Sequence, residues 1–210
     1  MTFFRDYFDD ISARIRDVDP VQLELLCQLF RAVSGCGRKV VLVGNGGSAA
    51  MASHVAVDLT KAAGVRAVNF NEADLITCFA NDYGYPLWVD KALEAYSDPG
   101  DAAVLISSSG RSPNILNGAT AARSRGLHVV TFSGFDADNP LRSLGELNFW
   151  VNSRSYNAVE MAHHVWLVAA VDRLASEKGA AIESTSARVA HRRPGIHRHG
   201  SDRRPARARL

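Results

Sequence analysis

Cysteine is scarce in this sequence, and long apolar runs are absent. The 210 residues include three cysteines, Cys27, Cys36 and Cys78, with no closely spaced pair. A disulfide framework is therefore not expected, and a reducing compartment is favoured. No apolar run approaches the roughly 20 residues that cross a bilayer. The N-terminal segment MTFFRDYFDDIS lacks the basic and apolar regions of a signal peptide. We expect a cytoplasmic protein with no membrane partner.

The sequence also has little net charge, but its positive charge is concentrated at one end. The total is +2, and residues 188–210 carry eight arginines and one acidic residue, a local net charge of +7 that leaves −5 for residues 1–187. Residues 185–210 are predicted to form a disordered, solubilising tail. The less favoured alternative is contact of this tail with nucleic acid or another acidic partner. No aromatic residue lies among the arginines, so stacking on bases is not indicated.

Hydrophobic residues make up 47% of the chain, as in an ordinary globular domain. Short apolar runs of the buried parallel-strand kind occur at 39–43, 102–106, 128–132 and 147–151. Helices are predicted over residues 3–17, 20–33, 49–63, 72–81, 86–96, 113–125 and 157–178. The alternation predicts an α/β fold with a doubly wound parallel sheet in a single domain, residues 1–184. Helices at 1–35 precede the sheet, and one long helix follows it.

The first strand ends in a glycine-rich loop, Gly44-Asn-Gly-Gly-Ser48. Ligands of open parallel sheets bind beyond the carboxyl ends of the strands. The unpaired amides of the following helix make a natural anion site there. The same loop also fits the dinucleotide pattern G-x-G-x-x-A, which calls for an acid at the end of the second strand. Glu72 lies late for that role, so a nucleotide cofactor is not expected.

The second strand ends in a serine-rich loop, Ser107-Ser-Ser-Gly-Arg-Ser112. One serine would be enough to cap the helix that follows. Four hydroxyls beside helix amides suit a phosphomonoester, which needs many hydrogen-bond donors and little cationic charge. The pair of loops therefore predicts a phosphate-binding site.

The motifs GNGGSAA and SSSGRSPN together resemble the two signatures of the SIS (sugar isomerase) domain family, and more narrowly its phosphoheptose isomerase branch. The resemblance covers about residues 3–178. It implies an aldose–ketose isomerisation, of sedoheptulose 7-phosphate to D-glycero-manno-heptose 7-phosphate or of a related phosphosugar. It also implies a homotetramer with active sites between subunits, in which the helices at 1–35 take part in packing. The substrate-binding residues that it implies are Asn45, Gly46, Gly47, Ser48, Asn81, Asp82, Ser107, Ser108, Ser109, Ser112 and Glu160.

Two acid–histidine pairs carry the spacing of a catalytic or metal site. His54 and Asp58 are four residues apart on one predicted helix, and Glu160 and His164 are four apart on another. Each pair shares a helix face, so its side chains can converge on one atom. Two imidazoles and two carboxylates form a plausible ligand set for zinc or a similar divalent ion. A divalent metal held by these four residues is therefore predicted.

The family comparison places Asp58 on the catalytic glutamate and His54 on a metal-binding histidine. It places Val168, which cannot transfer a proton, on the catalytic histidine. Either His164, one turn earlier, has taken that role, or the isomerase chemistry is lost. Asp82 stays a candidate for proton transfer. Asp58, His164 and Asp82 are therefore the predicted catalytic residues.

Two functions follow from these residues. The favoured one is a sugar-phosphate aldose–ketose isomerase. The alternative is a non-catalytic sugar-phosphate-binding or regulatory protein, since one relative of this branch associates with the bacterial replication initiator.

Overall fold

The computed structural model describes residues 2–191, and the chain divides into two units, residues 1–178 and 179–210. The first unit contains a five-stranded parallel sheet of β1 (Val40–Val43), β2 (Ala67–Asn69), β3 (Ala102–Ser107), β4 (His128–Ser133) and β5 (Leu147–Trp150). The strand order is β2-β1-β3-β4-β5. The order reverses between β1 and β3, which is where doubly wound folds bind their ligands.

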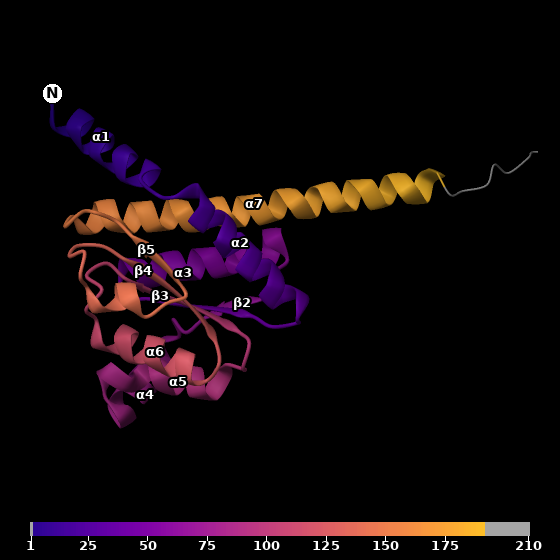
Figure 1. The fold of residues 1–210 in the computed structure, drawn as a ribbon. Helices are drawn as coiled ribbons and strands as arrows, with labels where there is room; N and C mark the ends of the chain where they lie inside the picture. Colours follow the sequence, from indigo (N-terminus) through magenta and orange to yellow (C-terminus); the bar gives the residue numbers. More distant parts are fainter. Residues whose placement is uncertain (1, 192–210) are drawn as a thin grey trace, which may run out of the picture. The chain divides into compact units, whose positions relative to one another are not determined.

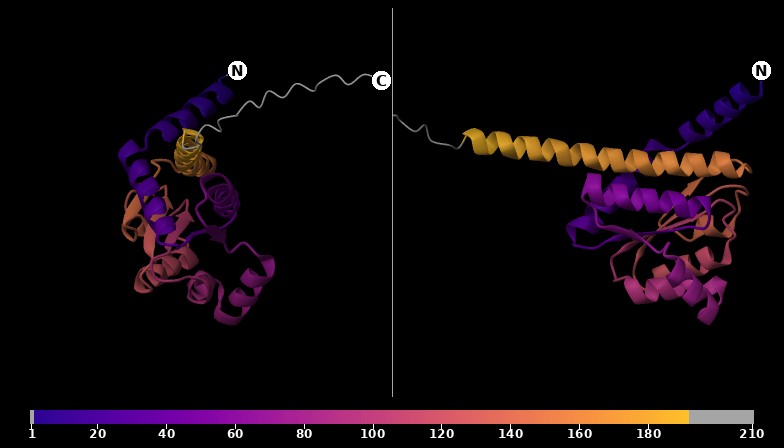
Figure 2. Two further views of the ribbon diagram at one scale, coloured as in Figure 1. Left: turned by 90° about the vertical axis from the view of Figure 1, so that its right-hand side faces the viewer. Right: turned by 180° about the vertical axis from the view of Figure 1, so that it is seen from behind.

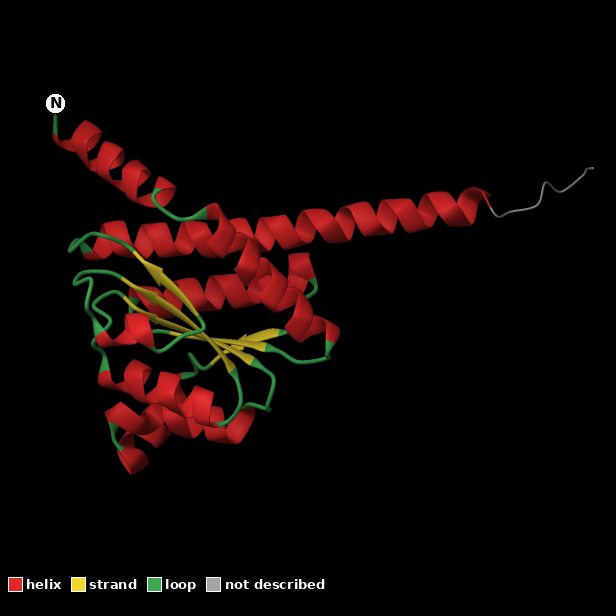
Figure 3. Ribbon diagram, in the orientation of Figure 1, coloured by secondary structure: helices red, strands yellow, loops and turns green. Residues whose placement is uncertain are grey.

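Helices cover both faces of the sheet (Figures 1 and 3). One face packs against α2 (Pro20–Gly35), α3 (Gly47–Asp58) and the first turns of α7 (Tyr156–His191). The other face packs against α4 (Ala73–Tyr83), α5 (Trp88–Tyr96) and α6 (Pro113–Ser124). Neighbouring residues of one strand serve opposite cores: Leu42 belongs to the first and Val41 to the second. Both faces of the sheet are therefore buried from solvent, which explains why the strands are uninterrupted apolar runs.

The two N-terminal helices differ in their packing. Helix α2 begins at Pro20 after Asp19, whose carboxylate accepts a hydrogen bond from the Val21 amide at 2.9 Å. It buries Leu26 and Phe30 against the sheet. Helix α1 (Phe3–Arg16) buries no residue, and Figures 1 and 2 show it extending away from the sheet. An unpaired apolar face of this kind is available for association.

The predicted α/β fold is confirmed, with two differences in detail. Strand β2 was not predicted, because its three residues, Ala-Val-Asn, give no apolar run. Helix α7 continues to His191, past the predicted end at 178 and into the predicted tail at 185–210. Residues 174–191 are mostly good helix formers without proline, so the helix continues where the apolar pattern stops. The rest of the predicted tail, 192–210, lies outside the described residues. In the described part, no helix is long and apolar enough to span a membrane.

Candidate active site

The glycine-rich loop connects β1 to α3 at the switch point of the sheet. Gly46 caps α3 with φ +53°, a left-handed conformation that glycine adopts without strain. Gly47 opens the helix, and a side chain at this position would collide with the carboxylate of Glu160. Ser48 follows in the first turn and is buried. The loop thus brings backbone amides to the carboxyl edge of the sheet, as predicted for an anion site.

The serine-rich loop leaves the neighbouring strand, β3, and leads into α6. Ser107 and Ser112 close the loop through a 3.0 Å hydrogen bond between their hydroxyls. The Ser109 hydroxyl accepts a hydrogen bond from the Arg111 amide at 3.2 Å. The Ser108 hydroxyl is buried and has no partner among the described residues. A buried, unpaired hydroxyl is costly, and a bound ligand would satisfy it.

A cavity of about 200 Å³ lies between the two loops. Among the described residues, no lysine or arginine lines it. An anion in this cavity would be held by hydroxyls and helix amides rather than by cations. All five predicted serines line the cavity, which places them together as predicted. Its wall consists of Asn45, Ser48, Ile106, Ser107, Ser108, Ser109, Ser112, Tyr156 and Glu160.

A pair of asparagines joins the two loops, and only one of them was predicted. The Asn45 amide donates to Asn114 Oδ1 at 3.0 Å, and the buried Asn114 amide donates back to Asn45 Oδ1 at 2.9 Å. The Tyr85 hydroxyl also donates to Asn45 Oδ1, at 3.0 Å. Asn114 follows the proline that opens α6, and this polar position in the motif SSSGRSPN was the available signal. The pair fixes the spacing between the loops.

His54, Asp58 and His164 form one hydrogen-bonded chain between α3 and α7. His54 Nε2 lies 3.0 Å from Asp58 Oδ2, and His54 Nδ1 lies 2.9 Å from His164 Nε2. The carboxylate accepts from His54 Nε2–H, so in a neutral ring His54 Nδ1 must accept from His164 Nε2–H. His164 Nδ1 then carries a free lone pair. The tautomers follow from the hydrogen bonds, and they make His164 Nδ1 a base.

The surroundings of His164 favour its neutral form. Burial and the neighbouring His54 ring lower the pKa of His164, and Asp58 opposes them in part. A neutral imidazole at neutral pH can accept a proton. The predicted transfer of the catalytic role to His164 therefore has a base of the right kind in place.

The four predicted metal ligands are not gathered around one point in this arrangement. Both ring nitrogens of His54 are occupied by hydrogen bonds, and Glu160 makes none with the other three predicted ligands. In the described part of the chain, no group of three or more His, Cys, Asp or Glu side chains could hold a metal. The predicted zinc ion stays a prediction, and no step below depends on it.

Of the other residues considered in the sequence, two pack in or against the core and two lie on helix α4. Val168 packs against the core, so it has no catalytic part. His163, beside His164, is fully buried and donates from Nε2 to the Ser133 carbonyl at 2.9 Å. Asp82 lies on α4 and accepts hydrogen bonds from Asn81 and Cys78. The predicted roles of Asn81 and Asp82 in the sugar site stay predictions.

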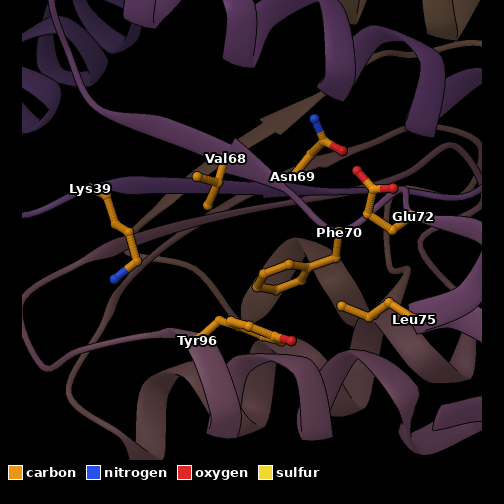
Figure 4. Close-up of a pocket in the computed structure, with 7 residues that line it drawn as sticks. All are labelled: Lys39, Val68, Asn69, Phe70, Glu72, Leu75 and Tyr96. Atoms are coloured by element: carbon orange, nitrogen blue, oxygen red, sulfur yellow. The ribbon is translucent and has the colours of Figure 1, made fainter. Parts of the chain in front are cut away.

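A larger cavity, of about 360 Å³, lies beside the edge strand β2 (Figure 4). It shares no lining residue with the serine cavity. Its wall is chiefly apolar, with Val68, Phe70, Leu75 and Tyr96. Nothing in that wall matches the predicted chemistry.

Comparisons with known proteins agree with the fold and the loops. Residues 4–134 match the SIS domain family. A phosphoheptose isomerase of Syntrophotalea carbinolica is 30% identical over 183 residues, which cover 84% of this chain and 92% of the relative. One from Fusobacterium nucleatum is 31% identical over 147 residues, 68% of this chain and 75% of the relative. The solved phosphoheptose isomerase of Neisseria gonorrhoeae superposes with a TM-score of 0.75 at 25% identity, covering 83% of this chain and 97% of that one.

The match extends over most of the chain and includes both loops of the cavity. The SIS match, residues 4–134, covers more than half of the 210 residues. The relative from Syntrophotalea carbinolica is covered almost from end to end. The chain therefore belongs to the SIS domain family, on the branch of the phosphoheptose isomerases.

Proposed function

We propose that this protein is an aldose–ketose isomerase that interconverts sedoheptulose 7-phosphate and D-glycero-manno-heptose 7-phosphate, or acts on a related phosphosugar. The observation that carries the proposal is the serine cavity at the switch point of the sheet, with the unpaired Ser108 hydroxyl in its wall. The relatives named phosphoheptose isomerase support the choice of substrate.

In the proposed complex, the phosphate binds in the serine cavity. Its oxygens accept hydrogen bonds from the serine hydroxyls and from amides at the start of α3 and α6. Phosphate binding fixes one end of the sugar, and this restricts the positions that the carbonyl end can occupy. The pair Asn45 and Asn114 keeps the two halves of the cavity at a constant spacing.

In the proposed reaction, His164 Nδ1 removes a proton from C1 of the ketose. The proton returns to C2 of the resulting enediolate, and the hydroxyl proton shifts between the oxygens, so that an aldose forms. Asp58 stabilises the positive charge that His164 and His54 share while the proton is held. Base catalysis of this kind accelerates proton transfer by about 10²- to 10⁴-fold.

We also propose that the protein works as a homo-oligomer, most simply a tetramer. The hydrogen-bonded chain is open to solvent, since the His54 side chain is 54% exposed. Exposed apolar residues border it: Val57 on α3, and Met161 and Val165 on α7. A second copy over this face would bury these residues and exclude water from the base. The three free cysteines support the proposed cytoplasmic location.

The test is incubation of the purified protein with sedoheptulose 7-phosphate, with and without added zinc, and detection of the aldose product by NMR. Thermal-shift measurements with the same sugar phosphate report binding separately. Aldose formation supports the proposal. Binding without aldose overturns the isomerase and favours a sugar-phosphate-binding regulator. Size-exclusion chromatography with light scattering tests the assembly, and a monomer at all concentrations would contradict it.

A further inference from the structure

Glu160 places a carboxylate inside a cavity that is otherwise built for an anion. It lines the wall together with Ser48, Ser108 and the other serines. A Cβ added at Gly47 would lie 2.2 Å from Glu160 Oε2, so the carboxylate lies directly against the first residue of α3. That is the end of the helix where a phosphate would bind.

No group in the described part of the chain compensates the charge of Glu160. It takes part in no ion pair there, and the cavity wall contains no lysine or arginine. The pKa of Glu160 is raised, and burial is the cause. If a cation or a hydrogen-bond donor held this carboxylate, it would lower the pKa instead.

The charged groups on the neighbouring elements are directed elsewhere. In the serine loop, Arg111 pairs with Asp136 at 3.6 Å and with Asp138 at 3.8 Å. On α3, His54 is bonded to Asp58 and to His164 of α7. The Glu160 carboxylate therefore faces hydroxyls and backbone, and an incoming phosphate meets its negative charge directly.

We infer that Glu160 is a specificity-determining residue: its carboxylate lies against the start of α3, beside the proposed phosphate position, and opposes phosphate binding by its negative charge. This inference rests on the proposed function of the serine cavity as the phosphate site. Like charges a few ångströms apart in a partly buried site repel strongly. The serine donors must therefore overcome this repulsion, and affinity for the phosphosugar is set lower than the donors alone would allow.

The test is the substitution Glu160→Gln, which keeps the shape of the side chain and removes its charge. Inorganic phosphate and sedoheptulose 7-phosphate serve as probes in isothermal titration, and unphosphorylated sedoheptulose is the neutral comparison. We expect both phosphates to bind the variant about tenfold more tightly, since a like charge has been removed. We expect no gain for the neutral sugar. Circular dichroism checks that the variant is folded.

Glu146→Gln is the matched control. Glu146 is exposed, pairs with His128 at 3.0 Å, and does not line the cavity. The same chemical change there should leave phosphate affinity unaltered.

The possible results separate this inference from the proposed function. Wild-type binding of the phosphosugar with weaker or equal binding by Glu160→Gln overturns the inference alone, because Glu160 would then hold the substrate or be neutral to it. An equal gain for Glu146→Gln also overturns the inference, because the effect would reflect net charge. Absence of phosphate binding to both wild type and Glu160→Gln overturns the proposed function and the inference together.

Discussion

The two ends of the site are built in different ways. The proposed phosphate end has many weak donors on two loops, which the sheet and the pair Asn45 and Asn114 hold in place. The proposed proton-transfer end is one chain of hydrogen bonds between two helices, from Asp58 through His54 to His164. Loss of one donor from the first set weakens binding, whereas loss of one member of the second set removes the base or its support. We therefore expect single substitutions to impair the proposed phosphate end less than the proposed proton-transfer end.

The largest effect is expected at the end of the hydrogen-bonded chain. His164→Gln removes the base, so kcat should fall by about 10²- to 10⁴-fold while KM stays nearly constant. Steady-state assays with sedoheptulose 7-phosphate measure both constants. Val168→Ala is the control, because Val168 packs against the core and should be dispensable for turnover. If Val168→Ala lost turnover while His164→Gln kept it, the assignment of His164 as the base would be wrong.

Asp58→Asn should have the next largest effect. It leaves His54 and His164 in place but removes the charge that stabilises them when protonated, and kcat should fall about 10²-fold. Asp58 raises the pKa of His164 against the other influences on it. Its removal should lower that pKa, so the acid limb of the kcat/KM profile should move to lower pH. An acid limb that stays in place would show that His164 is not the titrating base.

Ser108→Ala is expected to sharpen the contrast between the two ends. Its hydroxyl is buried with no partner within the described protein, so its removal should not lower folding stability and should raise it slightly. The loss of one hydrogen bond to phosphate should raise KM about tenfold at constant kcat. Ser143→Ala is the matched control, since the Ser143 hydroxyl donates to the Pro140 carbonyl and does not line the serine cavity. A large fall in kcat for the Ser108 variant would break the division between binding and chemistry.

Substitution of the neighbouring histidine, His163, is expected to change turnover least. Its effect should appear in the pH dependence of folding stability instead. Burial lowers the pKa of His163 to about 4, and the hydrogen bond to Ser133 opposes this. Between pH 6.5 and 4 the unfolded chain binds a proton that the folded protein excludes, so stability should fall as the pH is lowered through this range. The loss amounts to about 3 kcal/mol. Urea unfolding of the wild type and His163→Gln at several pH values measures it, and an equal slope in both would assign the loss to other groups.

The sequence predicted the phosphate end more completely than the proton-transfer end. The glycine-rich and serine-rich loops directly follow apolar strands in the sequence. This pattern alone places Gly46, Gly47 and the serines at one edge of the sheet. The spacing of His54 and Asp58 placed them on one helix face. The spacing could not show whether His164 would form a hydrogen bond with His54 or coordinate a metal. That choice depends on the packing of α3 against α7. The partnership of Asn45 with Asn114 was missed for the same reason.

Packing also separates two side chains that the sequence placed on one helix face. Glu160 and His164 are four residues apart and share a helix face, yet their surroundings differ. Glu160 lies against Gly47 in the serine cavity, while His164 reaches His54 farther along α3. Helical spacing gives the face of a helix, but the neighbouring loop decides what each side chain meets.

His164 is proposed to carry the proton between C1 and C2, and isotope exchange follows that proton. Sedoheptulose 7-phosphate is incubated in deuterated water with wild type or His164→Gln, and deuterium at the two carbons is followed by NMR. We expect incorporation with the wild type to the extent that the proton on His164 exchanges with solvent, and loss of both incorporation and aldose formation in a variant that still binds the sugar phosphate. Undiminished incorporation or aldose formation with His164→Gln would contradict this role.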